Sequence, residues 1–278
     1  MKTIKKPELK EDVQKFFETI EKHIEIAAPA NIMEFTNLFN VFRVVNAEYQ
    51  IPNRLKGKLV KRVNLLFTDK QYQSGVDLLN FDTISKILSD TLHYGHVPVV
   101  GVKLEEVLQR KDSAFTMNSI VRLLDSLMAS DHGIEQLDRL MRRLEGVIAA
   151  PHNFESLNLS QAVHIIRAYA YSQHINLIKH RIIEKLIRLI ETKLSEMEEG
   201  DALILTQAYQ YIDTNVPYSA RLWNKLNQTI AEQALSSPED VSLSFTTKYL
   251  ARFFDISPTR GLSKETWEKW IKMLEDKI

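Results

Sequence analysis

A hydrophobic helix-loop-helix pattern that recurs about six times is the feature that most constrains the fold of this chain. An apolar residue, often followed by proline, marks each loop, and the marks recur with a period of roughly 40 residues, as expected of stacked helical hairpins. The marks are Ile51, Val97, Ile134, Ile175, Val216 and Ile256. Such hairpins cannot bury their apolar faces alone and build a continuous core by packing on their neighbours. The sequence therefore predicts an all-α fold, a right-handed α-solenoid of about six helix-turn-helix repeats.

The predicted domain organisation is a capping helix followed by one repeat domain. Residues 12–27, DVQKFFETIEKHIEIA, carry apolar residues at three-to-four spacing, which is typical of an amphipathic helix. We therefore expect an N-terminal capping helix within residues 1–30 and an α-helical repeat domain over 31–278. The joint DKQYQSGVDLLN explains why the interval from Ile51 to Val97 is the longest, and it is the candidate for a bend at 68–80 or an extra functional loop. No strand pattern of useful length is present.

Composition restricts the kinds of site that the chain can hold. With 36 basic and 36 acidic side chains the protein lacks a broad positive field, so any polyanion site must be local. The absence of cysteine excludes disulfides, thiolate metal sites and cysteine nucleophiles. No apolar run approaches the roughly 20 residues that span a bilayer, so no transmembrane segment is predicted. The first residues show neither a secretory signal nor a clear mitochondrial presequence.

Two short segments repeat each other closely. Ala168-Tyr169-Ala170-Tyr171 is followed one repeat later by Ala208-Tyr209-Gln210-Tyr211. Small alanines let helices approach each other while the rings fill the flanking space. We interpret the tyrosines as core residues, with stacking on a nucleobase as the alternative.

The chain resembles organellar helical-repeat families in LNLSQAVHIIRAYAYSQHINLIKHRIIEKLIRLI and GDALILTQAYQYIDTNVPYSARLWNKLNQTIAEQ. These are the heptatricopeptide and octotricopeptide repeats and the helical part of the FAST-kinase-like RNA-processing proteins. The resemblance covers about residues 115–255 and implies mitochondrial or plastid RNA metabolism, with binding by the helical surface and no catalysis by the repeats. A C-terminal nuclease-like domain is not recognisable, which favours an adaptor or scaffold. The resemblance transfers no specific RNA-contacting residue.

Two sets of basic residues are the candidate RNA or polyanion site. The first set lies in RLKGKLVKR, on one face of a predicted helix. The other set lies on the second helix of the third predicted repeat and on that of the fourth. If second helices line one wall of the solenoid, the two sets join into a discontinuous stripe that can contact phosphates. The alternative is a solvated helix exterior. The residues are Arg54, Lys58, Lys61 and Arg62, then Arg139, Arg142, Arg143, Lys179, Arg181, Lys185 and Arg188.

Two tryptophans near the C-terminus are the candidate partner-binding residues. Trp267 and Trp270 lie three positions apart in TWEKWIKML, on one face of a predicted helix. The rings either complete the cap of the last repeat or form a docking surface for a partner.

Other groups of reactive residues lack the arrangement that chemistry requires. Adjacent Ser130, Asp131 and His132 cannot converge as a catalytic triad, and the histidines lack a zinc-protease pattern. An acidic group occupies a predicted exposed turn, where we expect solvation. It comprises Glu191, Glu196, Glu198, Glu199 and Asp201. We therefore predict no catalytic residue, no metal ligand and no cofactor.

The leading functional hypothesis is a non-catalytic helical-repeat adaptor of a mitochondrial ribonucleoprotein assembly, active in RNA processing, editing or translation. Its expected partners are other protein subunits of a large complex and single-stranded RNA. The alternative is a structural accessory subunit of a respiratory or ATP-synthase complex, with protein contacts only. Mitochondrial localisation rests on the resemblance alone, with the cytoplasm as the alternative.

Overall fold

The computed structural model describes an all-α protein. It covers residues 6–26, 51–92, 95, 97–109, 115–128, 134–176, 180–212, 215–236, 245–246, 248–252 and 264–277. Every regular element in these ranges is helical, and none of them contains a strand. The predicted all-α fold class is therefore confirmed. Residues 31–50, with which the predicted repeat domain begins, lie outside the described residues. None of the described helices has the length and apolar character that a bilayer crossing requires.

The chain divides into two compact units, Met1–Leu140 and Met141–Ile278. The division falls inside one helix, α8 (Ile134–Ile148). The segment 69–80, where we expected a bend or an extra loop, belongs wholly to the first unit and contains two short helices, η1 (Lys70–Tyr72) and α4 (Gln73–Asp77). The Asp69 carboxylate caps η1 by accepting the Gln71 N–H at 3.0 Å.

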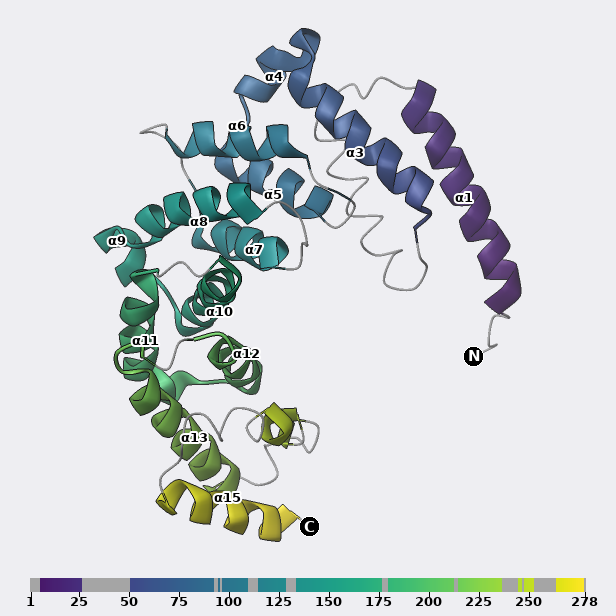
Figure 1. Cartoon of the computed structure of the whole chain (residues 1–278). Coiled ribbons are helices and arrows are strands. Elements are labelled where there is room, and N and C mark those ends of the chain that lie inside the picture. The colour runs from purple at the N-terminus through teal and green to yellow at the C-terminus, as the bar shows by residue number, and fades with distance from the viewer. Residues whose placement is uncertain are drawn as a thin grey trace. The chain divides into compact units, whose positions relative to one another are not determined.

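In the first unit, each helix packs on a near neighbour in the sequence (Figure 1). The N-terminal helix α1 lies against α3, α3 contacts α4 and α6, and α5 packs on both α6 and α7. The larger helices are α1 (Lys6–Ile26), α3 (Asn53–Thr68), α5 (Phe81–Leu92), α6 (Pro98–Leu108) and α7 (Met117–Met128). Their apolar stripes meet in a core that includes Leu59, Phe81 and Leu104, all with no exposed surface.

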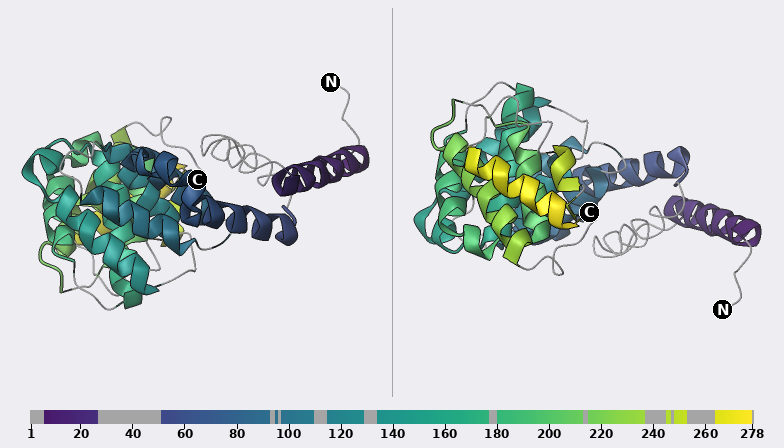
Figure 2. Two further views of the ribbon diagram at one scale, coloured as in Figure 1. Left: turned by 90° about the horizontal axis from the view of Figure 1, so that it is seen from above. Right: turned by 90° about the horizontal axis from the view of Figure 1, so that it is seen from below.

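In the second unit, first helices pack on first helices and second helices on second helices. The long helix α10 contacts its hairpin partner α11 and also α12, whereas α11 contacts α13 and α13 contacts α15. Figure 2 shows α15 lying against α13. The helices are α9 (Pro151–Glu155), α10 (Leu159–Asn176), α11 (Ile182–Thr192), η2 (Leu194–Glu196), α12 (Glu199–Tyr209), α13 (Ser219–Ser236) and α15 (Lys264–Lys277).

Local sequence signals set several helix starts. Pro98 and Pro151 occupy the first positions of α6 and α9, where an N–H has no intrahelical partner. At α10, Asn158 accepts the Gln161 N–H at 2.8 Å, and the Gln161 side chain accepts the Asn158 N–H at 3.1 Å. This reciprocal pair satisfies two otherwise unpaired donors at the helix start.

The repeated tyrosines divide into a buried pair and a half-buried pair. Tyr169 and Tyr209 are buried, and their hydroxyls donate to the carbonyls of Met141 at 2.7 Å and Ser219 at 2.9 Å. The core interpretation is therefore confirmed for these two residues. Tyr171 and Tyr211 are half-buried, and their rings meet edge to face at 5.1 Å.

The two tyrosine segments, which lie one repeat apart in the sequence, contact each other where α10 packs on α12. Tyr171 contacts Tyr211, and one turn earlier Arg167 donates to Gln207 at 3.1 Å. Both pairs join equivalent positions of successive repeats, so the two helices lie in register. The buried alanines 168, 170 and 208 allow this close approach.

The difference between the two tyrosine positions generates a prediction about stability. Tyr169→Phe removes the hydroxyl that donates to the Met141 carbonyl, and it should lower the free energy of unfolding by about 1–2 kcal/mol. Tyr171→Phe alters a half-buried position and should change it by less than about 0.5 kcal/mol. Chemical denaturation of both variants measures the difference. Equal losses would contradict the assignment of Tyr169 to the core.

Candidate functional site

The basic cluster of α3 is partly engaged inside the protein. Arg54 Nε and Lys58 Nζ lie 2.6 and 2.5 Å from the Glu21 carboxylate on α1. The hydrogen bond from Lys58 lowers the pKa of Glu21, and burial opposes this change. Two of the four predicted phosphate ligands therefore attach α1 to α3. Lys61 is exposed and Arg62 is half-buried.

On α8, the three predicted arginines do not share one role. Arg139 Nε donates to Glu105 of α6 at 2.8 Å, so this side chain links two helices of the first unit. Arg142 and Arg143 belong to the second unit, and both are exposed. The predicted stripe therefore has members in both units.

The predicted cations at α11 form a third group. Arg181, Lys185 and Arg188 are exposed and follow each other at helical spacing along one side of the helix. Within the described ranges, the side chains of Arg181 and Lys185 make no polar contact with other residues. Arg188 donates to Glu184, one turn earlier, at 2.6 Å. Lys179 lies outside the described residues.

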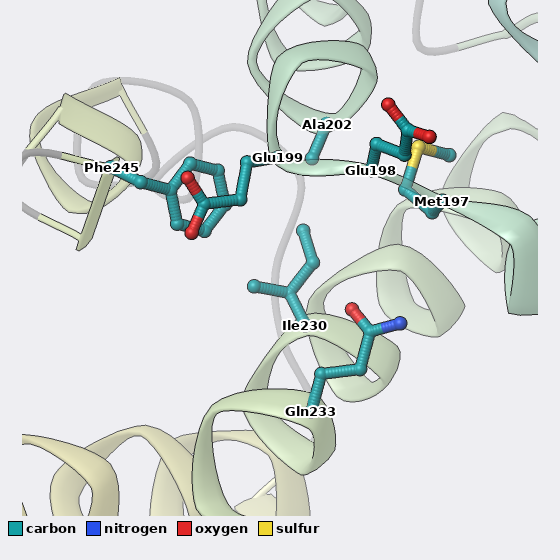
Figure 3. Close-up of a pocket in the computed structure, with 7 residues that line it drawn as sticks. All are labelled: Met197, Glu198, Glu199, Ala202, Ile230, Gln233 and Phe245. Carbon is teal, nitrogen blue, oxygen red and sulfur yellow. The ribbon is translucent and has the colours of Figure 1, made fainter. Parts of the chain in front are cut away.

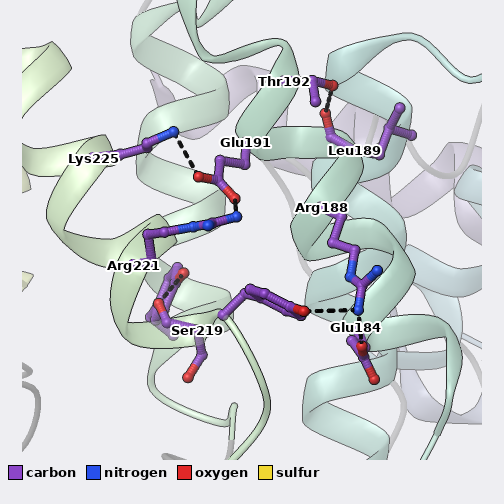
Figure 4. A network of polar contacts seen from close by, with 10 residues as sticks. Glu184, Arg188, Leu189, Glu191, Thr192, Ser219, Arg221 and Lys225 are labelled. Carbon is purple, nitrogen blue, oxygen red and sulfur yellow. Dashed lines mark hydrogen bonds and ion pairs between the residues drawn. The ribbon is translucent and has the colours of Figure 1, made fainter.

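A recessed carboxylate, Glu191, organises the surface between α11 and α13. Its two oxygens lie 2.6 Å from Arg221 Nη2 and 2.6 Å from Lys225 Nζ (Figure 4). The Glu191 side chain is only 7% exposed, whereas those of Arg221 and Lys225 are 58% and 52% exposed. Burial raises the pKa of Glu191, but the bonds from Lys225 and Arg221 outweigh it and leave the pKa lowered. The acid is held inside while both cations reach solvent.

Tyr218 lies beside the same network, just before α13. The centre of the Arg188 guanidinium is 4.4 Å from the centre of the Tyr218 ring, and that of Arg221 is 5.1 Å away. Arg188 also donates to the Tyr218 hydroxyl at 3.1 Å. Tyr218 is one of the large hydrophobic residues that remain exposed, with 40% of its surface accessible. We call Arg188, Glu191, Tyr218, Arg221 and Lys225 the α11–α13 cluster.

Glu145 of α8 fixes the beginning of α11. Its carboxylate accepts the Ile182 N–H at 2.9 Å and lies 3.1 Å from Nδ1 of buried His180. The His180 ring meets the Tyr169 ring edge to face at 4.9 Å. Burial raises the pKa of Glu145, but the contacts with His180 and Ile182 reverse this and lower it. This carboxylate therefore holds the chain that positions Arg181 and Lys185.

The expectation of simple solvation is wrong for two members of the acidic group. Glu191 is recessed in the α11–α13 cluster, and Asp201 is buried in the first turn of α12. Glu196 and Glu198 are exposed and Glu199 is half-buried. The sequence interpretation failed because it judged the group by its charge, although Glu191 follows buried Ile190 at the border of the apolar stripe.

A small pocket lies between the start of α12, α13 and Phe245 (Figure 3). Its walls include Glu198, Glu199, Ile230 and Phe245. The volume of about 30 Å³ holds roughly one or two water molecules.

The two tryptophans have different environments. Trp270 is buried, and its ring stacks on Tyr249 with centroids 5.3 Å apart, so it belongs to the core of the second unit. Because it is buried, this ring is not accessible to a partner protein. Trp267 is half-buried and is the member of the pair with accessible surface.

No group of histidine and acidic side chains among the described residues has the arrangement of a metal site. His180 is buried in the contact with Glu145. Residues 93, 96 and 130–132, which include two histidines and the Ser-Asp-His trio, lie outside the described residues.

Searches for similar proteins found no matching family model, no significantly similar curated protein and no significantly similar solved structure.

Sequence reasoning missed Glu145, Tyr218, Arg221 and Lys225. Arg221 and Lys225 lie four positions apart on a predicted helix, which is a detectable signal for one face. Their common partner Glu191 lies on a different helix, α11, and that pairing requires the structure.

The pKa shift of Glu145 generates a pH prediction. Glu145→Ala should destabilise the protein by about 1–3 kcal/mol at pH 7, because the Ile182 N–H loses its acceptor. A lowered pKa means that the contribution is complete above the ordinary pKa of 4.5 and is lost as pH falls through the lowered value. The difference from the wild type should therefore shrink below pH 4.5. Thermal denaturation across this range tests it, with Glu155→Ala on α9 as an exposed control. A difference independent of pH would contradict the assigned role.

Proposed function

We propose that this protein is a non-catalytic helical-repeat adaptor that binds single-stranded RNA and other protein subunits in a mitochondrial ribonucleoprotein assembly. The proposal includes a right-handed α-solenoid as the arrangement of its hairpins. Its support in the second unit is the in-register packing of α10 on α12 and the contact of α11 with α13. The mitochondrial location rests on the resemblance to organellar repeat families.

The observation that carries the RNA proposal is the outward display of cations along α11 and α13. Arg181, Lys185, Arg188, Arg221 and Lys225 are all exposed. The acidic partner of Arg221 and Lys225, Glu191, is recessed, so the accessible surface is more basic than the residue count suggests. Such a surface binds phosphates and releases counterions, which makes the affinity depend on salt. RNA is the polyanion that agrees with the resemblance.

A salt titration of RNA binding tests the proposal. The full-length chain should bind a fluorescent single-stranded RNA saturably, with log K falling linearly as log salt rises. The double variant Arg181→Gln and Lys185→Gln should weaken binding and reduce the slope by roughly 0.7 for each phosphate that is no longer neutralised. The matched control, Lys264→Gln and Lys272→Gln, removes two exposed charges of α15 and should retain the slope.

Two results would count against RNA binding. One is the absence of saturable, salt-sensitive binding, and the other is an equal fall in slope for the double variant and its control. The first result removes the RNA part of the proposal, and the second assigns the binding to net charge and not to α11.

A structural accessory subunit of a respiratory or ATP-synthase complex is the second candidate. Basic and acidic residues are equal in number within each unit, and Glu21 neutralises part of the α3 cluster. In addition, the first unit exposes apolar side chains that a protein partner can cover, Leu78 at 87% and Val102 at 44%. Crosslinking in the native assembly separates the candidates. Contacts to proteins and none to RNA would favour the accessory subunit.

A further inference from the structure

We infer that Tyr218 is a stacking residue for one nucleobase of single-stranded RNA, flanked by Arg188 and Arg221 as ligands of the adjacent phosphates. This inference rests on the proposed RNA-binding function and specifies how the α11–α13 cluster takes part in it. It also predicts a preference for strands that carry bases over a bare sugar-phosphate chain.

The backbone of Tyr218 is the first observation. Its φ angle is 66°, and it is the only non-glycine residue in the described part of the chain with a positive value. A bulky side chain rarely adopts this conformation, because its Cβ approaches the neighbouring carbonyl. Such strain persists only when surrounding contacts hold it, and it is concentrated at functional sites. Here Tyr218 ends a turn, and its carbonyl accepts the Leu222 N–H at 2.9 Å as α13 begins.

The accessible ring is the second observation. Buried tyrosines of this unit, such as Tyr169 and Tyr209, donate their hydroxyls to backbone carbonyls. Tyr218 differs because the residue is 40% exposed and its hydroxyl accepts from Arg188. The guanidinium groups of Arg188 and Arg221 lie over this ring. A base that binds here displaces one of them from the ring or stacks on its plane, because a base stacks on either kind of plane.

The position of the charges is the third observation. Glu191 is the recessed member of the cluster. It pairs with Arg221 and Lys225 and so orients these exposed side chains before any ligand arrives. Side chains fixed in this way lose less conformational freedom on binding. The other carboxylate at the cluster is that of Glu184, whose side chain is 40% exposed and pairs with Arg188 at 2.6 Å. An RNA phosphate can replace Glu184 as the partner of Arg188 without exposing a buried charge.

The residues around Tyr218 favour a nucleotide over other anions. A free phosphate contacts only the guanidinium groups and Lys225, and it leaves the Tyr218 ring without a role. A single strand of RNA supplies a phosphate and a planar base within one repeating unit. It therefore accounts for both the cations and the ring.

Binding of two matched strands to the full-length chain tests this inference. The probes are a twelve-residue oligouridine and a ribose-phosphate strand of the same length without bases. The wild type should bind the base-containing strand about tenfold more tightly, because stacking on an aromatic ring favours it. Tyr218→Gly should lose this preference, whereas Tyr218→Phe should retain it.

Thermal denaturation of the same variants separates binding from folding. Glycine adopts a positive φ without strain, so Tyr218→Gly should remain folded and melt at or above the temperature of Tyr218→Ala. Photocrosslinking of the oligouridine should in addition map to the peptide that contains Tyr218. A preference that survives in folded Tyr218→Gly would overturn the inference and leave Tyr218 as a link between α11 and α13.

A gain-of-affinity variant provides a test in the opposite direction. Glu184→Gln should raise RNA affinity about two- to fivefold, because it releases Arg188 from an exposed ion pair. Glu196→Gln removes an exposed acid from η2 and is the matched control for net charge. Equal gains in the two variants would contradict the assigned role of Arg188. If no variant and no wild-type protein binds RNA, the proposed function itself fails.

Discussion

The packing of each amphipathic helix on the next equivalent helix is the constraint on which the second unit depends. A hairpin such as α10 and α11 leaves an apolar side uncovered, and α12 and α13 cover it. The buried alanines and tyrosines at the α10–α12 contact set how closely the helices approach. This register also fixes α11 beside α13, which places Arg188 and Arg221 around Tyr218. The candidate surface is thus a consequence of the packing.

The charges show how a neutral protein can present a basic surface. On α3, the cations face a carboxylate of α1 and serve the fold. On α13, Arg221 and Lys225 share the recessed carboxylate of Glu191 from α11 and extend into solvent. The two sets look alike in the sequence, and both have a recessed acidic partner. They differ in the exposure of the lysine, because the Lys58 side chain is 20% exposed and that of Lys225 is 52% exposed. Counts of charged residues therefore could not distinguish a structural cluster from a candidate binding cluster.

Helix content and the buried faces were predictable, because they follow from local periodicity. The pattern in residues 12–27 predicted a helix that the structure contains as α1, and the repeat period predicted that the tyrosine segments are equivalent. The pairing of Glu191 with Arg221 was not predictable, since it joins two helices that α12 separates in the sequence. The positive φ of Tyr218 was also hidden, because tyrosine gives no local signal for that conformation.

Crosslinking in the chain's cysteine-free background tests the central claim, that α10 and α12 pack in register, most directly. Cysteines replacing Arg167 and Gln207 should react with a short bifunctional reagent that spans about 8–10 Å, the usual distance between packed helix axes. Cysteines replacing Arg167 and exposed Gln210 are the matched pair out of register. In-register packing predicts fast intramolecular crosslinking of the first pair only. Equal rates for the two pairs would contradict it.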